Sequence, residues 1–483
     1  MLTIILLLIP LIGGGLLFIT KANASTSKNI ALVTALAELA VAAYSFLTFD
    51  AANAAALEVK YGWLPDLHIN FHLGVDGISL LMLALTAFLV PLILLSTFKV
   101  SYKNPASFYG LILLTQAALV GVFTAKDIFV FYFFYEAALI PVYFLAALWG
   151  GKDAPKITFK MFVYTIFGSL FMLVALVYLY MMGQTADIQT LYVTAKALPI
   201  NAQSWLFWAF FIAFAIKMPL LPFHTWQPDV YTASPTPATM LLSGLLSKMG
   251  VYGLIRILMP LSPVGTVIWG GYGMILAIAG LLYGSIIAIQ QNNIKRLIAY
   301  SSFAHMGLMA AGVLSGTLDG IQGAMIQMVA HGINAVGLFF VIKVISDRTG
   351  TRELTSLGGI TQKTPALSIY FMIIMLGSVA LPLTNGFVGE FLLLKGVFGY
   401  NAWYGAIAGI TIILGAVYML RMIQRSMFGE ANAVTEKFKD VSGSEIAVLL
   451  PIAAAVILMG VFPNTFLKIT EPAVNAILQT IIK

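Results

Sequence analysis

The chain has 483 residues, of which 60% are hydrophobic and only 9% are Asp, Glu, Lys or Arg. Soluble domains have a charged share of about 25%, so 19 acidic and 26 basic side chains are too few to cover a water-facing surface of this size. The composition excludes a soluble globular protein and predicts a membrane protein. The chain has no cysteine, which excludes disulfides, thiol nucleophiles and cysteine-ligated iron–sulfur clusters.

Fourteen apolar runs follow one another along the chain, and a transmembrane helix needs about 20 such residues. The first run has no positive charge before it, so we expect a retained helix rather than a cleaved signal peptide. We therefore predict an all-α membrane protein with about 14 transmembrane helices. The runs cover approximately residues 2–20, 30–49, 75–98, 106–124, 128–149, 159–183, 205–222, 235–259, 267–290, 297–315, 320–345, 366–396, 402–427 and 444–462.

Lys and Arg residues predict the orientation. The loops after odd-numbered spans hold most of them, and basic loops mark the cytoplasmic side. Because the number of spans is even, we expect both termini outside and the loops near 150–158, 291–296, 346–365 and 428–443 inside. The net charge of +7 is spread over short loops, so we predict no nucleic-acid partner. The loops after odd-numbered spans carry Lys21, Lys28, Lys99, Lys103, Lys152, Lys156, Lys295, Arg296, Arg348, Arg352, Lys363, Lys437 and Lys439. The other loops and the C-terminal tail carry mainly Lys60, Lys126, Lys196, Lys468 and Lys483.

Two predicted spans contain helix-breaking residues, the seventh after Lys217 and the twelfth after Ala380. Proline removes a helix hydrogen bond, and broken helices at membrane depth are tolerated where they pack in protein or line a wet cavity. Paired interruptions in corresponding halves indicate a transport path through an internally repeated bundle, and kinks made for packing are the alternative.

The spacing of these two breaks also predicts how the chain is divided. Five spans run from the fourth to the eighth and five from the ninth to the thirteenth, with each break in the fourth helix of its set. We therefore expect an N-terminal three-helix segment (1–105), two five-helix repeats (106–260 and 261–430), and a last helix with a C-terminal tail (431–483).

Ionisable residues deep inside the spans are the candidates for function, because a charge at the bilayer centre costs about 2.5–3.5 kcal/mol. Polar side chains accompany them at helical spacing, and such stripes can hold water chains. His, Lys and Glu are also the side chains that burial makes able to exchange protons near pH 7. The pattern predicts a proton relay, while a packing role remains the alternative for each histidine alone. The six candidates are Glu136, Lys217, Lys248, His305, His331 and Glu390.

Other polar residues receive simpler interpretations. We expect His68 and His72, in the loop before the third span, to be surface side chains rather than metal ligands. The sequence has no HExxH zinc pair, no P-loop, no strand followed by GxGxxG and no nucleophile elbow, so we predict neither a cofactor nor a metal. Most of the remaining charges in or near spans are expected to anchor helix ends: Glu38, Lys160, Arg256, Lys343, Lys395, Arg421 and Glu445.

Several motifs together resemble the antiporter-like membrane subunits of respiratory complex I, from about residue 74 to residue 430. They are Gly74-Val-Asp-Gly-Ile-Ser79, Phe131-Tyr-Phe-Phe-Tyr-Glu136-Ala with Leu139-Ile-Pro141 and Trp149-Gly-Gly151, Phe214-Ala-Ile-Lys217-Met-Pro with Pro222-Phe-His-Thr-Trp-Gln-Pro-Asp229, Leu246-Ser-Lys248-Met-Gly-Val-Tyr-Gly253, Lys295-Arg-Leu-Ile-Ala-Tyr-Ser-Ser302 with His305-Met-Gly307, and Gly386-Phe-Val-Gly-Glu-Phe391.

The resemblance implies a fourteen-helix fold in which the two five-helix halves are inverted repeats with discontinuous seventh and twelfth helices. It implies proton translocation coupled to quinone reduction elsewhere in an NADH:quinone oxidoreductase, with no redox centre in this chain. The implied partners are other complex I membrane subunits and the lipid bilayer, and the implied location is the bacterial inner membrane.

The six candidates match the relay residues of that family. Glu136 matches the fifth-helix glutamate, Lys217 the lysine at the seventh-helix break, and Lys248 the central eighth-helix lysine, while His305 and His331 match the bridging histidines. Glu390 matches a twelfth-helix position that is lysine in the sister subunits and in multisubunit sodium/proton antiporters. Two alternative functions remain, a subunit of such an antiporter and a purely structural membrane scaffold. The glutamate at position 390 argues against the antiporter subunit, and the six ionisable groups inside the membrane argue against the scaffold.

Overall fold

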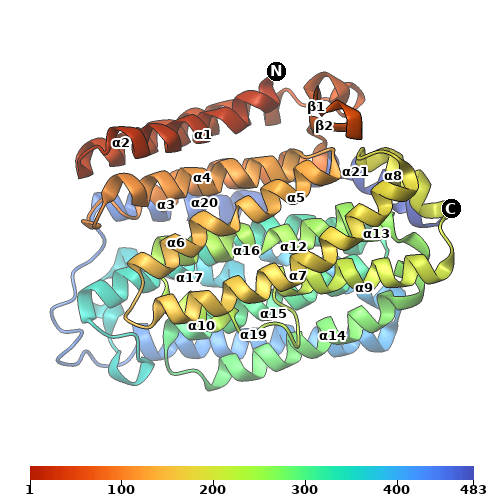
Figure 1. Ribbon diagram of the computed structural model, residues 1–483. Coiled ribbons are helices and arrows are strands. Elements are labelled where there is room, and N and C mark those ends of the chain that lie inside the picture. Colours follow the sequence, from red (N-terminus) through yellow and green to blue (C-terminus); the bar gives the residue numbers. More distant parts are fainter. Residues whose placement is uncertain (483) are drawn as a thin grey trace.

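Long apolar helices run side by side through the molecule in the computed structural model, which describes residues 1–482 (Figure 1). Thirteen helical segments of this described chain are long and apolar enough to cross a membrane. The helices are α1 (Leu2–Thr20), α2 (Ala24–Leu47), α3 (Gly77–Leu95), α4 (Pro105–Thr124), α5 (Ile128–Ala137), α6 (Leu139–Trp149), α7 (Ala154–Gly183), α8 (Ile188–Ala197), α9 (Ile200–Lys217), α10 (Gln227–Ala233), α11 (Thr236–Leu241), α12 (Lys248–Gly253), α13 (Met259–Leu261), α14 (Pro263–Gln290), α15 (Ile294–Leu314), α16 (Leu318–Thr349), α17 (Pro365–Ser378), α18 (Asn385–Tyr400), α19 (Ala402–Met427), α20 (Gly443–Val461) and α21 (Asn464–Ile482).

The predicted twelfth run, 366–396, is divided between α17 and α18, which have 14 and 16 residues. Each half is shorter than the roughly 20 residues of a complete crossing, so neither is among the thirteen long segments. The predicted seventh span also ends early, because α9 stops at Lys217 and α10 begins only at Gln227. Both predicted interruptions are therefore present in the structure.

A small sheet departs from the all-α prediction. Strands β1 (Val59–Leu64) and β2 (Ile69–Leu73) pair antiparallel, from Val59 opposite Leu73 to Leu64 opposite Ile69. The amphipathic helix α21 was also not predicted, because its apolar residues form one stripe instead of a continuous run. Together with α8 and both chain ends, the hairpin and α21 lie at one end of the bundle, here called the terminal end (Figure 1). Lys483, the last residue of the predicted C-terminal segment, lies outside the described residues.

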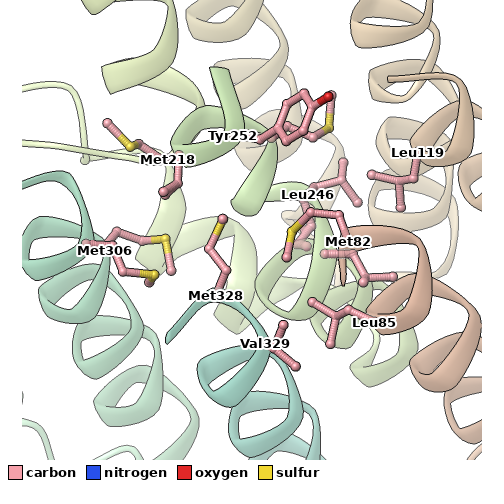
Figure 2. Close-up of a cluster of buried hydrophobic side chains, with 14 of the residues drawn as sticks. Met82, Leu85, Leu119, Met218, Leu246, Tyr252, Met306, Met328 and Val329 are labelled. Atoms are coloured by element: carbon pink, nitrogen blue, oxygen red, sulfur yellow. The ribbon is translucent and has the colours of Figure 1, made fainter. Parts of the chain in front are cut away.

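The segment Thr236–Leu261 is the centre of the bundle, and the whole of its apolar window is buried. Side chains from α3, α4, α15 and α16 pack around it (Figure 2). Gly250 permits a close approach, because a Cβ there would lie 2.6 Å from the Met218 Cβ and 2.8 Å from the Phe214 carbonyl oxygen. The absence of a side chain at Gly250 thus brings the break after α9 against the central helix.

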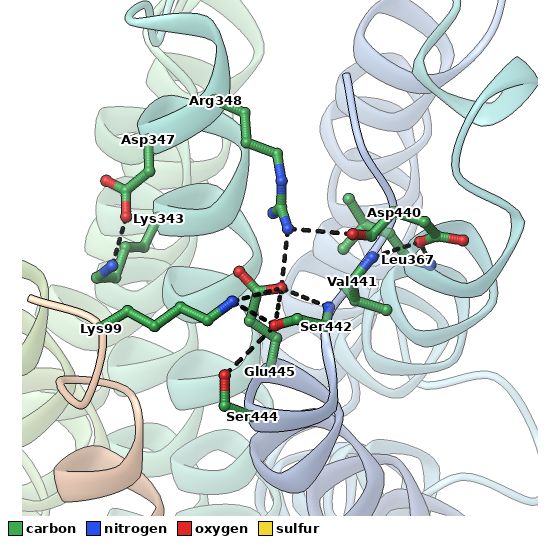
Figure 3. A network of polar contacts seen from close by, with 10 residues as sticks. All are labelled: Lys99, Lys343, Asp347, Arg348, Leu367, Asp440, Val441, Ser442, Ser444 and Glu445. Atoms are coloured by element: carbon green, nitrogen blue, oxygen red, sulfur yellow. Dashed lines mark hydrogen bonds and ion pairs between the residues drawn. The ribbon is translucent and has the colours of Figure 1, made fainter. Parts of the chain in front are cut away.

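The opposite end of the bundle, here called the loop end, is held by a polar network (Figure 3). Arg348 of α16 lies 2.8 Å from the Glu445 carboxylate and donates a 3.2 Å hydrogen bond to the Asp440 carbonyl oxygen. The Asp440 carboxylate accepts hydrogen bonds of 2.9 and 3.0 Å from the Ala366 and Leu367 amides. Because these amides open α17, the network fixes the start of the divided helix to α16 and α20.

Candidate functional site

Lys248 lies in the central segment between two π-helical turns, Leu242–Leu246 and Leu254–Leu258. Such turns are rare, and they occur frequently at functional sites because they leave backbone carbonyls without their usual helix partners. The Lys248 Nζ donates a 2.5 Å hydrogen bond to the Ser243 carbonyl oxygen and lies 3.3 Å from the Ser247 Oγ. The fully buried lysine therefore takes two of its polar partners from its own distorted helix.

Lys248 and His331 form a direct pair, with 2.7 Å between the Nζ and Nδ1 atoms. An ammonium has only donors, so a charged Lys248 requires an unprotonated Nδ1 on His331. If the proton moves to the imidazole, the neutral amine becomes the acceptor. The pair holds one proton in either position, because two positive charges at this distance would repel each other in a buried site.

His305 and Glu390 form a second pair, with 3.0 Å between the Nε2 and Oε1 atoms. The other ring nitrogen, Nδ1, lies 2.8 Å from the Ser301 carbonyl oxygen, which can only accept. Nδ1 therefore carries a hydrogen, and the bond to Glu390 requires one further proton, either on Nε2 or on the carboxylate. The His305 and His331 ring centroids lie 5.4 Å apart, so the two pairs are adjacent.

The break between α17 and α18 positions Glu390. Asn334 of α16 and Asn385, the first residue of α18, exchange two side-chain hydrogen bonds of 3.1 Å. Ala380 and Leu383 have positive φ angles of 57° and 70°, which non-glycine residues rarely adopt. The amide pair thus fixes a strained connection against α16, one and a half turns before Glu390.

A cavity of about 20 Å³ adjoins the His305 and Glu390 pair, and Ser285, Ser378 and Tyr418 contribute to its walls. A site of this size holds about one water molecule when polar groups line it. The Ser301 and Tyr418 hydroxyls lie 3.1 Å apart beside His305. The Tyr418 hydroxyl, which lines the cavity, supplies an additional polar partner that a water at Glu390 would need.

Lys217 is the last residue of α9 and is buried. Its Nζ lies over the Tyr135 ring, 4.7 Å from the centroid, which is a favourable position for an ammonium. Trp226 donates a 3.0 Å hydrogen bond to the Ile216 carbonyl oxygen, which the broken helix leaves without a partner. The irregular connection therefore holds Lys217 inside the bundle at the helix end.

Glu136 interacts electrostatically with Lys217 and with the Ser169 hydroxyl of α7. It is half-buried and lies one residue before the end of α5. Pro141 in the following α6 lacks an amide hydrogen, which leaves the Ala137 carbonyl without a helix partner and accounts for the break at Ala138. Glu136 thus stands beside a third interruption, in the fifth predicted span.

A cavity of about 10 Å³ adjoins Lys217, and Trp226 and Ser247, the residue before Lys248, are also among its lining residues. Its volume is near the minimum for one water molecule. The structure thus joins four candidates through close contacts, from Lys248 through His331 and His305 to Glu390. Glu136 and Lys217 form a second group that interacts electrostatically, and Lys217 lines this cavity.

Several expectations for the remaining charges are wrong. Glu38 is not an end-of-helix anchor but lies in the middle of α2, 1% exposed, with no hydrogen-bond partner for Oε2. Arg256 is also buried and pairs with Asp76, which Lys126 of the loop before α5 contacts as well. His72 is buried between Glu58 and Asp187, at 3.3 Å from each carboxylate. Arg256 and His72 find their partners through tertiary contacts that sequence spacing does not reveal.

Three comparisons identify relatives of this arrangement. The family model described as "NADH:quinone oxidoreductase/Mrp antiporter, TM" matches residues 125–415. NADH-quinone oxidoreductase subunit M of Rickettsia typhi is 37% identical over 96% of this chain and 95% of its own length. The chain belongs to this subunit M family.

Further relatives agree with the assignment. Subunit M of Rhodobacter capsulatus is 38% identical, with 94% of this chain and 90% of that protein covered. A chain in the structure of respiratory complex I from Thermus thermophilus with bound NADH superposes with a TM-score of 0.93 at 32% identity, and each chain is covered in full. The fold is therefore that of the antiporter-like membrane subunits.

Sequence reasoning missed some residues of the site. Asn385 follows the recognised break, yet its pairing with Asn334 depends on contact between α16 and α18. Ser169 belongs to a different span from its partner Glu136. The motif around Lys248 contains no proline, so no signal in the sequence indicated the two π turns.

Proposed function

We propose that this chain is the proton-translocating subunit M of an NADH:quinone oxidoreductase, a multi-pass membrane protein whose partners are the other membrane subunits of that complex. The observation that carries the proposal is the continuous contact path from Lys248 to Glu390. Each member of the path can hold or release a proton, and none of them is an isolated packing residue.

The proton transfer starts at Glu136 and Lys217. When Glu136 compensates the Lys217 ammonium, the charged lysine is stabilised. When that pairing weakens, an uncompensated buried charge is costly, and the proton leaves through the water-sized cavity toward Lys248. The energy must reach Glu136 from other subunits through coupled charges or helix motion, because redox chemistry belongs elsewhere in the complex.

The second half of the transfer uses the pair of Lys248 with His331 and the pair of His305 with Glu390. A proton arriving at Lys248 passes to His331 and then to His305, and it leaves through Glu390. Each step exchanges a proton between neighbouring groups, so the charge carried by each pair alternates without any covalent change. Glu390 is the release gate in this scheme, and the cavity beside it supplies the water that accepts the proton.

The membrane arrangement extends this proposal. The divided α17 and α18 together form the twelfth of fourteen crossings. The terminal end faces the periplasm of a bacterial inner membrane, and the basic loop end faces the cytoplasm. Residues 106–260 and 261–430 are the two inverted five-helix repeats. Support comes from the breaks at corresponding places, one after Lys217 and one before Asn385.

Replacing Glu136 by Ala tests the function. We expect NADH-driven proton pumping by the purified, assembled complex in proteoliposomes to be lost, because Lys217 loses its compensating charge. Glu436→Ala, at an exposed glutamate of the loop end, is the matched control and should pump normally. Full pumping by an assembled Glu136→Ala complex would sink the assignment of the relay.

A further inference from the structure

A cavity of about 390 Å³ opens at the terminal end, outside the relay described above. Asp76 and Arg256 line it, together with Tyr192 of α8 and Thr480 of α21. Helix α21 crosses directly over the start of α3, where a Cβ on Gly77 would collide with the Ile469 carbonyl oxygen. The cavity has room for many water molecules, so a water-accessible space reaches the central helix from this end.

Three charged side chains meet where the cavity reaches the central helix. Asp76 pairs with Arg256, and the Lys126 Nζ lies 3.4 Å from the same carboxylate oxygen. The Lys126 and Arg256 side chains are only 7% and 8% exposed. Two cations share one anion, so this cluster carries a net charge of +1.

Asp76 cannot act as a proton carrier in this cluster. Burial alone would raise the pKa of its carboxyl group, but Arg256, Lys126 and the Ser79 amide together hold that pKa well below the usual range. The Ser79 amide donates a 3.0 Å hydrogen bond to Oδ1, which fixes the carboxylate at the start of α3. The group stays ionised at physiological pH and holds the two cations in place.

Arg256 follows Lys248 by eight residues on the same helix, which corresponds to about 12 Å at the usual helical rise. Tyr252 lies between them, with the Arg256 guanidinium 5.9 Å from its ring centroid. The Tyr252 hydroxyl donates a 3.0 Å hydrogen bond to the Phe123 carbonyl oxygen, and its ring packs among apolar side chains (Figure 2). Tyr252 and its apolar neighbours thus lie along the helix between the charged cluster and the turn that holds Lys248.

We propose that Asp76, Lys126 and Arg256 form a charged seal that prevents protons in the terminal-end cavity from reaching Lys248. The inference rests on the proposed function, since a relay group open to both sides of the membrane would allow protons to flow back. A fixed positive charge excludes protons from a narrow path. The seal explains why the relay turns sideways from Lys248 toward Glu390 instead of continuing along its own helix.

Variants of Arg256 in the assembled complex test the seal. The readout is the collapse of an imposed pH gradient across proteoliposomes without NADH. Arg256→Met keeps the bulk but removes the charge, and it should speed the collapse at least tenfold, which corresponds to a barrier lower by about 1.4 kcal/mol. Arg256→Lys keeps the charge, so the pH gradient should collapse as slowly as with the wild type. If the guanidinium had a purely structural role, both variants would speed the collapse.

Lys126→Met is the second variant, because it preserves the Asp76 and Arg256 pair and so avoids an unpaired buried charge if Arg256→Met fails to assemble. It should also leak, and Thr480→Val, which changes only an uncharged wall of the same cavity, should not. The proposed seal is overturned if the pH gradient collapses no faster with Arg256→Met than with the wild type. If Arg256→Met does not assemble, the same result with Lys126→Met overturns it. This result differs from failure of the proposed function, which shows as full NADH-driven pumping by Glu136→Ala.

Discussion

The two histidines differ in what their neighbours allow. His305 donates from Nδ1 to a carbonyl oxygen that cannot change its role, so only its Nε2 takes part in exchange with Glu390. His331 presents Nδ1 to an amine that can donate or accept. The fixed hydrogen bond orients the His305 ring toward the carboxylate, and this gives the path between the two pairs a direction toward Glu390.

Replacing Glu390 by Gln tests this arrangement at the residue scale. The amide keeps the shape but cannot accept a proton, so His305 loses its exchange partner. We expect proton pumping to fall by about a hundredfold, within the usual range for losing a positioned acid or base, while the complex remains assembled.

The control for this variant is Lys395→Gln in the same helix. Lys395 is exposed and pairs with Asp319 at 2.9 Å, away from the relay, and its replacement should leave pumping unchanged. Normal pumping by Glu390→Gln, measured by dye quenching in proteoliposomes, would remove Glu390 from the path.

Helix interruptions place the relay residues at the scale of single elements. Lys217 ends a helix, Lys248 lies between two π turns, and Glu390 follows a strained connection. Proline signalled the first and third of these in the sequence, because it lacks an amide hydrogen. The π turns on either side of Lys248 contain no proline, so the pattern of residues did not reveal them.

Gly250→Ala tests the contact between the central helix and the break after α9. The new methyl group would lie 2.6 Å from the Met218 Cβ, so the two helices must separate. Overpacking of this kind costs about 1–3 kcal/mol, and we expect a lower melting temperature of the purified complex together with weaker pumping, because Lys217 and Lys248 move apart.

Gly409→Ala is the matched control for that change, since a Cβ at this position meets no atom within 4 Å. It should leave both the melting temperature and the pumping rate unchanged. An unaltered Gly250→Ala complex would show that the close approach has no role in holding the two lysines together.

At the scale of the whole molecule, hydrophobic runs were sufficient to predict the helical bundle, and prolines within them predicted the two divided spans. They could not predict the hairpin β1 and β2 or the amphipathic α21, because neither depends on a continuous apolar segment. The cost of buried charge identified the six relay candidates from the sequence. It did not identify the cluster around Asp76, whose members lie near span ends and meet only in the folded bundle.

The central claim is that protons cross this subunit through Lys248. Its most direct test is the number of protons moved per NADH by the assembled complex carrying Lys248→Met, which keeps the length of the side chain and removes its titratable group. The account predicts a lower ratio than in the wild type, with electron transfer still measurable. An unchanged ratio at normal turnover would contradict it.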